Sequence, residues 1–408
     1  MDALNSRQAS SQLVLSLFVQ DPSGASVRVT NTSGPQPSPA LIESGLSGGA
    51  SSAASVAVNA IIEIVANGNG DISVAVASDG VVSATTKDGD DRVDIWAKAA
   101  TGLYTGAGND EINVITRGSY DYDTDGKRLN SVSRVHSGAG DDRVRLNTHG
   151  AVDLVAAGSG NDDIEIDSSL EVTKEDVEKG TIGVTRVNGE GGDDVIRIRA
   201  ASMAFAVSGG DGDDVIDIQA TSALGIDGGN GNDTITVTAD NGVAITGGAG
   251  DDAIFIRGSA FGVNGGEGND HIVIEGDGTH VSSVVVGQGT DLVETNEAIV
   301  LQGLAKGVDD VFDTSHLNFS RIASDTIVIG IEGRDDTVIV KFTGEMAEVE
   351  KLEFEMDSAG GLLIREAGSE VTSNLEKTFK IDREAGSIAE RQAVRQVLGL
   401  PDSIVLKG

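Results

Sequence analysis

Short runs in which aliphatic residues alternate with polar or small residues recur through the middle of the chain. Within 209–227, Ile216 and Ile218 form one such run, and Leu224 and Ile226 form a second run after an intervening turn. Period-two alternation indicates short strands that bury one face. The pattern continues with Ile235, Val237, Val243 and Ile245, and then with Ile254, Ile256, Phe261 and Val263. Two such strands in every ~19 residues predict flattened coils that stack through a core of Ile and Val.

A glycine-aspartate turn separates consecutive coils. The pattern Gly-x-Gly-x-Asp has eight complete copies, and weaker copies end at Asp91 and Asp194. A repeat of about 19 residues, lengthened twice to 32, marks a solenoid in which each repeat is one coil stacked on the last. The complete copies contain Gly106, Gly108 and Asp110; Gly138, Gly140 and Asp142; Gly158, Gly160 and Asp162; Gly210, Gly212 and Asp214; Gly229, Gly231 and Asp233; Gly248, Gly250 and Asp252; Gly266, Gly268 and Asp270; and Gly287, Gly289 and Asp291.

The composition divides the chain into four segments. Proline, serine, glycine and alanine dominate much of 1–55, which predicts a partly flexible N-terminal flank, and 56–301 holds the coils. Alternating runs between turns predict a small antiparallel β module, a capping module, over 302–366. In 367–408, the capping-box sequence Ser387-Ile-Ala-Glu390 predicts a short C-terminal helix. The predicted fold class is therefore all-β: a parallel, β-roll-like solenoid with one Gly-x-Gly-x-Asp turn per coil, followed by the module and the helix.

The chain is strongly acidic, with a formal net charge of −36. Nucleic acids and anionic membranes are therefore poor partners, whereas multivalent cations are good ones. The chain has no cysteine, so neither a disulfide nor a thiolate metal site is available. It also lacks a run of 18 apolar residues, and we expect no membrane span. A cationic N-terminal region is missing too, so no cleaved secretory signal is expected.

Stacking the coils places the closing aspartates in one row. At ~4.8 Å spacing and an effective dielectric of about 20, two neighbouring charges repel by about 3.5 kcal/mol. Either the carboxyl groups are protonated or a cation lies between them. Turn glycines can aim backbone carbonyls at the same space, and an all-oxygen site of carboxylates and carbonyls favours calcium. The candidate metal residues are the glycines and aspartates above, Asp91 and Asp194, and the asparagines that precede four of the aspartates, Asn109, Asn161, Asn232 and Asn269. The simpler interpretation, that these sequences only make tight turns, remains open.

The turns resemble the Gly-Gly-x-Gly-x-Asp repeats of the haemolysin-type calcium-binding (RTX) family. Complete Gly-Gly versions occur at 209–214, 228–233, 247–252 and 265–270. The resemblance implies several calcium ions along one edge of the solenoid, held by the repeat aspartates and turn carbonyls. Residues 317–354 are similar to the β domain that often follows such repeats. Family membership implies type I secretion with an uncleaved C-terminal signal, folding on calcium binding outside the cell, and a structural or adhesive role of a secreted or bacterial cell-surface protein.

Other functions have weaker support in the sequence. No set of acid, base and nucleophile stands out, so no catalytic or organic-cofactor residue is assigned. Because parallel solenoids also carry polysaccharide lyases, epimerases and carbohydrate-binding modules, such an enzyme or module on the same scaffold is the alternative. The coils lack the regular threonine row that ice binding requires.

One insertion is a candidate recognition site. Residues 117–134 contain Tyr120 and Tyr122 beside three aspartates, and exposed aromatic rings with carboxylates could bind a glycan or a protein partner. The alternative is that these rings only pack the insertion onto its coil. The sequence does not indicate an oligomeric state.

Overall fold

The computed structural model describes 12–20, 25–31, 39–42, 50–57, 60–78, 80–116, 131–169, 183–258, 260–276, 281–285, 287–303, 317–321, 323, 325–331, 337–348, 352–356 and 361–366. The chain forms two compact units, Met1–Val195 and Ile196–Gly408. Both units are parallel β-solenoids, which confirms the predicted all-β solenoid. No α-helix occurs among the described residues, and none of their helical segments has the length and apolar character needed to cross a membrane.

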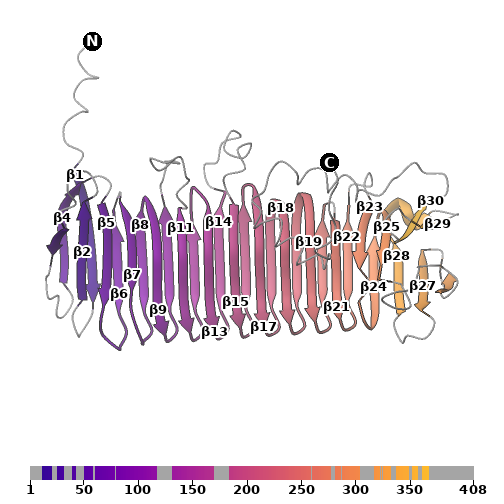
Figure 1. The fold of residues 1–408 in the computed structure, drawn as a ribbon, viewed down its shortest axis with the longest axis horizontal. Helices are drawn as coiled ribbons and strands as arrows, with labels where there is room; N and C mark the ends of the chain where they lie inside the picture. The colour runs from indigo at the N-terminus through magenta and orange to yellow at the C-terminus, as the bar shows by residue number, and fades with distance from the viewer. Residues whose placement is uncertain are drawn as a thin grey trace, which may run out of the picture. The chain divides into compact units, whose positions relative to one another are not determined.

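In the first unit, successive strands alternate between two parallel rows (Figure 1). The first row contains β6 (Ser73–Ala77), β8 (Arg92–Ala97), β10 (Glu111–Thr116), β12 (Arg143–Asn147) and β14 (Asp163–Ser168). The second contains β5 (Ala60–Ala66), β7 (Val81–Thr85), β9 (Ala99–Ala107), β11 (Val132–Ala139), β13 (Val152–Ser159) and β15 (Gly183–Gly191). Each coil thus gives one strand to each row.

The second unit repeats this arrangement, although two of its coils are continuous strands. These are β18 (Val215–Asn230) and β19 (Thr234–Ala249), which pair in parallel along nearly their whole length. The first row continues through β20 (Ala253–Arg257), β22 (His271–Glu275) and β24 (Thr290–Thr295). The second row contains β17 (Met203–Asp211), β21 (Ala260–Glu267), β23 (Val281–Val285) and β25 (Ala298–Gln302). One further strand, β16 (Val195–Ala200), begins at the boundary between the units.

The core matches the sequence pattern in the first row but differs in the second. Ile216 and Ile218 are fully buried, as predicted. In the second row, Ala223 rather than Leu224 joins Ile226 in the core, and Ala260 rather than Phe261 joins Val263. The register of β18 shifts between Leu224 and Ile226, where Gly225 has a φ of 64°. At this bulge two successive residues, Leu224 and Gly225, lie between the buried Ala223 and Ile226, so simple alternation predicts the wrong residue.

Antiparallel strands lie at the N-terminal end of the first unit, where the sequence predicted a partly flexible flank. They are β1 (Gln12–Gln20), β2 (Ala25–Asn31), β3 (Pro39–Ile42) and β4 (Ala50–Ala57). β1 pairs with β6 and β2 pairs with β5, which are the first strands of the two rows. Because the open end of a solenoid exposes unpaired backbone groups, these strands cover an edge that could otherwise bind another chain.

Further strands extend both rows of the second unit at its C-terminal end. β28 (Thr337–Phe342) pairs in parallel with β24, and antiparallel pairs join β28 to β27 (Thr326–Ile331) and β27 to β26 (Leu317–Arg321). In the other row, β30 (Leu362–Glu366) is antiparallel to both β25 and β29 (Leu352–Met356). A 3-10 turn covers Gly344–Glu348. The helix predicted within 367–408 lies outside the described residues.

The bulge makes a testable distinction between neighbouring side chains. We expect Ile226→Ala to lower the free energy of unfolding by about 2–4 kcal/mol, because Ile226 is fully buried. Leu224→Ala should cost about 1 kcal/mol or less, since this side chain is only partly buried. Chemical denaturation of both variants measures the difference. Equal losses would show that Leu224 belongs to the core.

Candidate metal centre

A ladder of buried aspartates runs along the glycine turns of each unit. Every closing aspartate from Asp91 to Asp291 is only 1–3 % exposed. The carboxylate Oδ1 accepts a hydrogen bond from the backbone N–H of the equivalent residue in the preceding coil in Asp91, Asp110, Asp142, Asp162, Asp194, Asp233, Asp252, Asp270 and Asp291. In the first unit, Asp91 N–H donates to Asp110 at 2.7 Å, and Asp142 N–H donates to Asp162 at 2.7 Å. The second unit repeats this bond from Asp233 to Asp252 at 2.8 Å. The predicted row of aspartates is therefore present in both units, one per coil.

The second carboxylate oxygen differs from the first. In Asp91, Asp110, Asp142, Asp162, Asp233, Asp252 and Asp270, Oδ2 is buried and accepts no hydrogen bond. No described basic side chain forms an ion pair with these seven aspartates. A buried polar atom without a partner costs on the order of 1–3 kcal/mol, and a charged one costs more. The ladder therefore needs a proton or a cation at Oδ2.

Glycines in the second unit leave a small cradle beside this oxygen. A Cβ built on Gly228 would lie 2.3 Å from Asp233 Oδ2 and 2.4 Å from the carbonyl oxygen of Gly247. A Cβ on Gly247 would lie 2.3 Å from Asp252 Oδ2 and 2.5 Å from the carbonyl oxygen of Gly265. Two oxygen acceptors thus face a space that any side chain would fill. Such oxygen donors fit a hard cation such as calcium.

Four coils of the first unit fill the corresponding position with side chains. Thr86, Thr105, Ser137 and Ala157 precede the turns there, and all four are buried. The hydroxyl groups of Thr105 and Ser137 lie beside the carboxyl groups of Asp110 and Asp142. The sequence predicted equivalent sites in all coils. The structure shows two kinds of coil, and the Gly-Gly doublets were the signal that distinguishes them.

Burial changes the proton affinity of the ladder. Loss of hydration raises the pKa of Asp110, Asp162 and Asp252 to about 7 and that of Asp142 to about 6. Hydrogen bonds from the backbone N–H of the preceding coil lower the pKa of Asp110 and Asp252, whereas the negative charge of nearby aspartates raises it further. Burial also raises the pKa of Asp91, Asp233 and Asp270. At neutral pH, the carboxyl groups whose pKa lies near 6 or 7 can therefore be neutralised by either a proton or a cation.

The asparagines that precede the aspartates do not reach this ladder. Asn109 and Asn161 lie in a separate, exposed ladder that alternates with Asp90, Asp141 and Asp193. Its hydrogen bonds run from each backbone N–H to a side chain in the preceding coil, opposite to the direction of the buried ladder. In the second unit, Asn232 and Asn269 alternate with Asp213 and Asp251 in the same way. Alternating amides and carboxylates separate the exposed charges, so this ladder supports stacking without a metal.

The turn glycines are required by the stack itself. All of the motif glycines have a positive φ except Gly287. At Gly231, for example, φ is 131°, and a Cβ would lie 2.0 Å from the carbonyl oxygen of Gly212. The glycines therefore allow the coils to approach one another and leave carbonyl oxygens exposed to the turn. Among the described residues, no three His, Asp or Glu side chains converge on a possible metal site, so carbonyls would supply most of the ligands of any ion.

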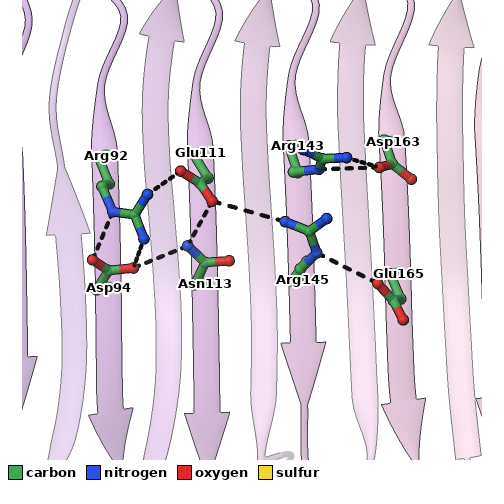
Figure 2. A network of polar contacts seen from close by, with 8 residues as sticks. All are labelled: Arg92, Asp94, Glu111, Asn113, Arg143, Arg145, Asp163 and Glu165. Carbon is green, nitrogen blue, oxygen red and sulfur yellow. Dashed lines mark hydrogen bonds and ion pairs between the residues drawn. The ribbon is translucent and has the colours of Figure 1, made fainter.

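Acidic side chains on the outer face of the first row are neutralised in a different way. Figure 2 shows Arg92 between Asp94 and Glu111, and Arg145 between Glu111 and Glu165. Arg143 adds an ion pair with Asp163 at 2.8 Å. These exposed pairs each contribute little, but the network links four coils. The contrast with the buried ladder, whose seven aspartates have no such pairing, strengthens the case for a small cation there.

The recognition site predicted around Tyr120 and Tyr122 lies outside the described residues. No protein-family model matches the chain, and no significantly similar protein was found among curated proteins or solved structures. The turn geometry and the ladder chemistry therefore carry the functional argument.

The raised pKa values give a test in calcium-free buffer. A carboxyl group whose pKa is 3.8 when unfolded and about 7 when folded stabilises the fold when protonated, and this stability is lost as the pH rises through about 7. We expect the melting temperature in excess chelator to rise as the pH is lowered from about 8 to about 5. Circular dichroism melts measure this. A melting temperature that falls over the same interval would contradict the assignment.

Proposed function

We propose that the protein is a calcium-binding β-solenoid of structural or adhesive function, secreted or held at a bacterial cell surface. The observation that carries this proposal is the glycine cradle, in which a buried carboxylate oxygen and a carbonyl oxygen face one small space. Asp233, Asp252 and the carbonyls of Gly247 and Gly265 would hold ions there. Bound calcium would supply positive charge to the ladder and bridge oxygen atoms of neighbouring coils.

The types of ligand atom favour calcium over zinc, copper and magnesium in such a space. The ladder consists of oxygen atoms alone, without the histidine or cysteine that zinc and copper prefer. Magnesium requires a tight octahedron and keeps several waters, which a carbonyl-rich turn accommodates poorly. Protons can neutralise the same carboxyl groups at lower pH. Calcium would therefore be the stabilising partner near and above neutral pH.

Export would couple this site to folding. A chain with uncompensated buried carboxylates is destabilised where calcium is scarce, and binding to the folded state alone adds directly to stability. A type I secretion route, which the RTX resemblance implies, uses an unfolded chain inside the cell. The segment 302–366 would then act as a capping module of the second solenoid. A structural or adhesive role agrees with regular, highly charged outer faces such as that in Figure 2.

A calcium titration of two glycine variants tests the proposal. We expect the wild-type protein to have a weaker β signal and a lower melting temperature in excess EGTA than in millimolar calcium, as measured by circular dichroism. Gly228→Ala should lose at least about half of the calcium-induced rise in melting temperature, because its Cβ would fill the cradle of Asp233. Gly70→Ala is the matched control, since a Cβ on Gly70 would contact nothing within 4 Å.

Two results would count against calcium. The first is an unchanged β signal and melting temperature when EGTA replaces calcium. The second is an equal calcium response of the Gly228 and Gly70 variants. Magnesium at the same concentration separates a specific site from general screening of charge, because screening alone would make both ions equally effective.

A further inference from the structure

A shallow, open groove lies on the second row of the second unit, outside the buried aspartate ladder. It has a volume of about 410 Å³ over three successive coils. Its floor is the backbone of Gly248, Gly266 and Gly287, one glycine from each coil. Thr246 and Asn264 form one wall, and Glu267 and Gln288 form the other. The volume is within the range of small-ligand sites, which is about 300–1,000 Å³.

The floor of the groove is fixed by the stacking of the coils. A Cβ on Gly266 would lie 1.9 Å from the carbonyl oxygen of Gly248, and a Cβ on Gly287 would lie 1.8 Å from that of Gly266. No side chain can therefore occupy the floor without separating the coils. A ligand can approach the backbone closely along this line.

The walls present hydrogen-bonding groups at the spacing of the coils. Thr246 and Asn264 are register partners, as are Glu267 and Gln288 in the opposite wall. Neither Thr246 nor Asn264 uses its side chain in a hydrogen bond with the described residues, whereas Gln288 Nε2 lies 3.4 Å from Glu267 Oε1. The hydroxyl and the two amides can both donate and accept hydrogen bonds, and the carboxylate accepts them. Their columns repeat every ~4.8 Å along the stack.

We propose that this groove binds a neutral oligosaccharide that runs across the coils. Sugar hydroxyls both donate and accept hydrogen bonds, as the two walls require, and an extended glycan repeats its hydroxyls along its length. No lysine or arginine lines the groove, and Glu267 together with the net charge of −36 disfavours polyanions. A peptide is a poorer fit, because Val285 is the one aliphatic side chain among the described residues that line the groove. This proposal does not depend on calcium in the buried ladder.

Calorimetric titration with cellohexaose, mannohexaose and maltohexaose, in calcium-containing buffer, tests this site. We expect at least one of them to bind. Asn264→Ala and Gln288→Ala should each weaken that binding by about fivefold, the effect of losing one hydrogen bond. Asn230→Ala is the matched control, because Asn230 lies two coils away in the column of Glu267 and bonds Asp211 outside the groove. Circular dichroism of each variant verifies that its fold is intact.

Three results would overturn the proposal. They are no binding of any of the three neutral probes, equal affinity of the wild type and both groove variants, and tighter binding of an anionic probe such as hexagalacturonate. Failure of the calcium response with normal glycan binding would count against the proposed calcium site alone. The two proposals can therefore fail separately.

Discussion

The buried carboxylate in each glycine turn is the constraint on which the rest of the structure depends. One oxygen binds the backbone N–H of the preceding coil, which fixes the register between coils. In seven of these aspartates the other oxygen is buried without a hydrogen bond. Burying such a group as a charge is costly, so the ladder that aligns the coils also requires a counter-charge or a proton. The stability of the fold, its pH dependence and the proposed calcium dependence therefore rest on the same row of atoms.

The remaining features of the coil serve this ladder. Fully buried aliphatic residues such as Ile216 and Ile218 hold the two rows together from inside. Glycines allow turn carbonyls to lie against the next coil, and the exposed ladder of Asn and Asp adds hydrogen bonds in the opposite direction. The residue beside the carboxyl group differs between coils. In four coils of the first unit it is a buried side chain such as that of Thr105, whose hydroxyl donates to the carbonyl oxygen of Ser137. In four coils of the second unit it is a glycine, which leaves a cradle there.

The sequence was sufficient to predict the solenoid because a period of about 19 residues and alternation of period two are both local signals. It was insufficient at Leu224, where the bulge depends on the positive φ of Gly225, and at Phe261, which a register shift leaves unpaired between Ala260 and Gly262; alternation reports neither. Among the strands within 12–57, β4 was missed because its alanine and serine residues lack the bulky side chains that mark strands, whereas the aliphatic residues of β1, such as Leu13 and Val19, did carry a strand signal. The aspartate row was predictable, but its separation into filled and open sites required knowing what lies beside each Oδ2. The hydrogen bonds of Asn109 and Asn161 likewise depend on neighbouring coils.

Replacement of Asp252 by asparagine tests most directly whether the buried charge is both a cost and a cation site. Asparagine keeps the oxygen that accepts the N–H of Asp233 but removes the charge. At about pH 8, Asp252→Asn should raise the melting temperature in excess EGTA and lower it in millimolar calcium, relative to wild type. The exposed neighbour Asp251→Asn should change neither value by a comparable amount. A shift of the same sign in both buffers would contradict the account.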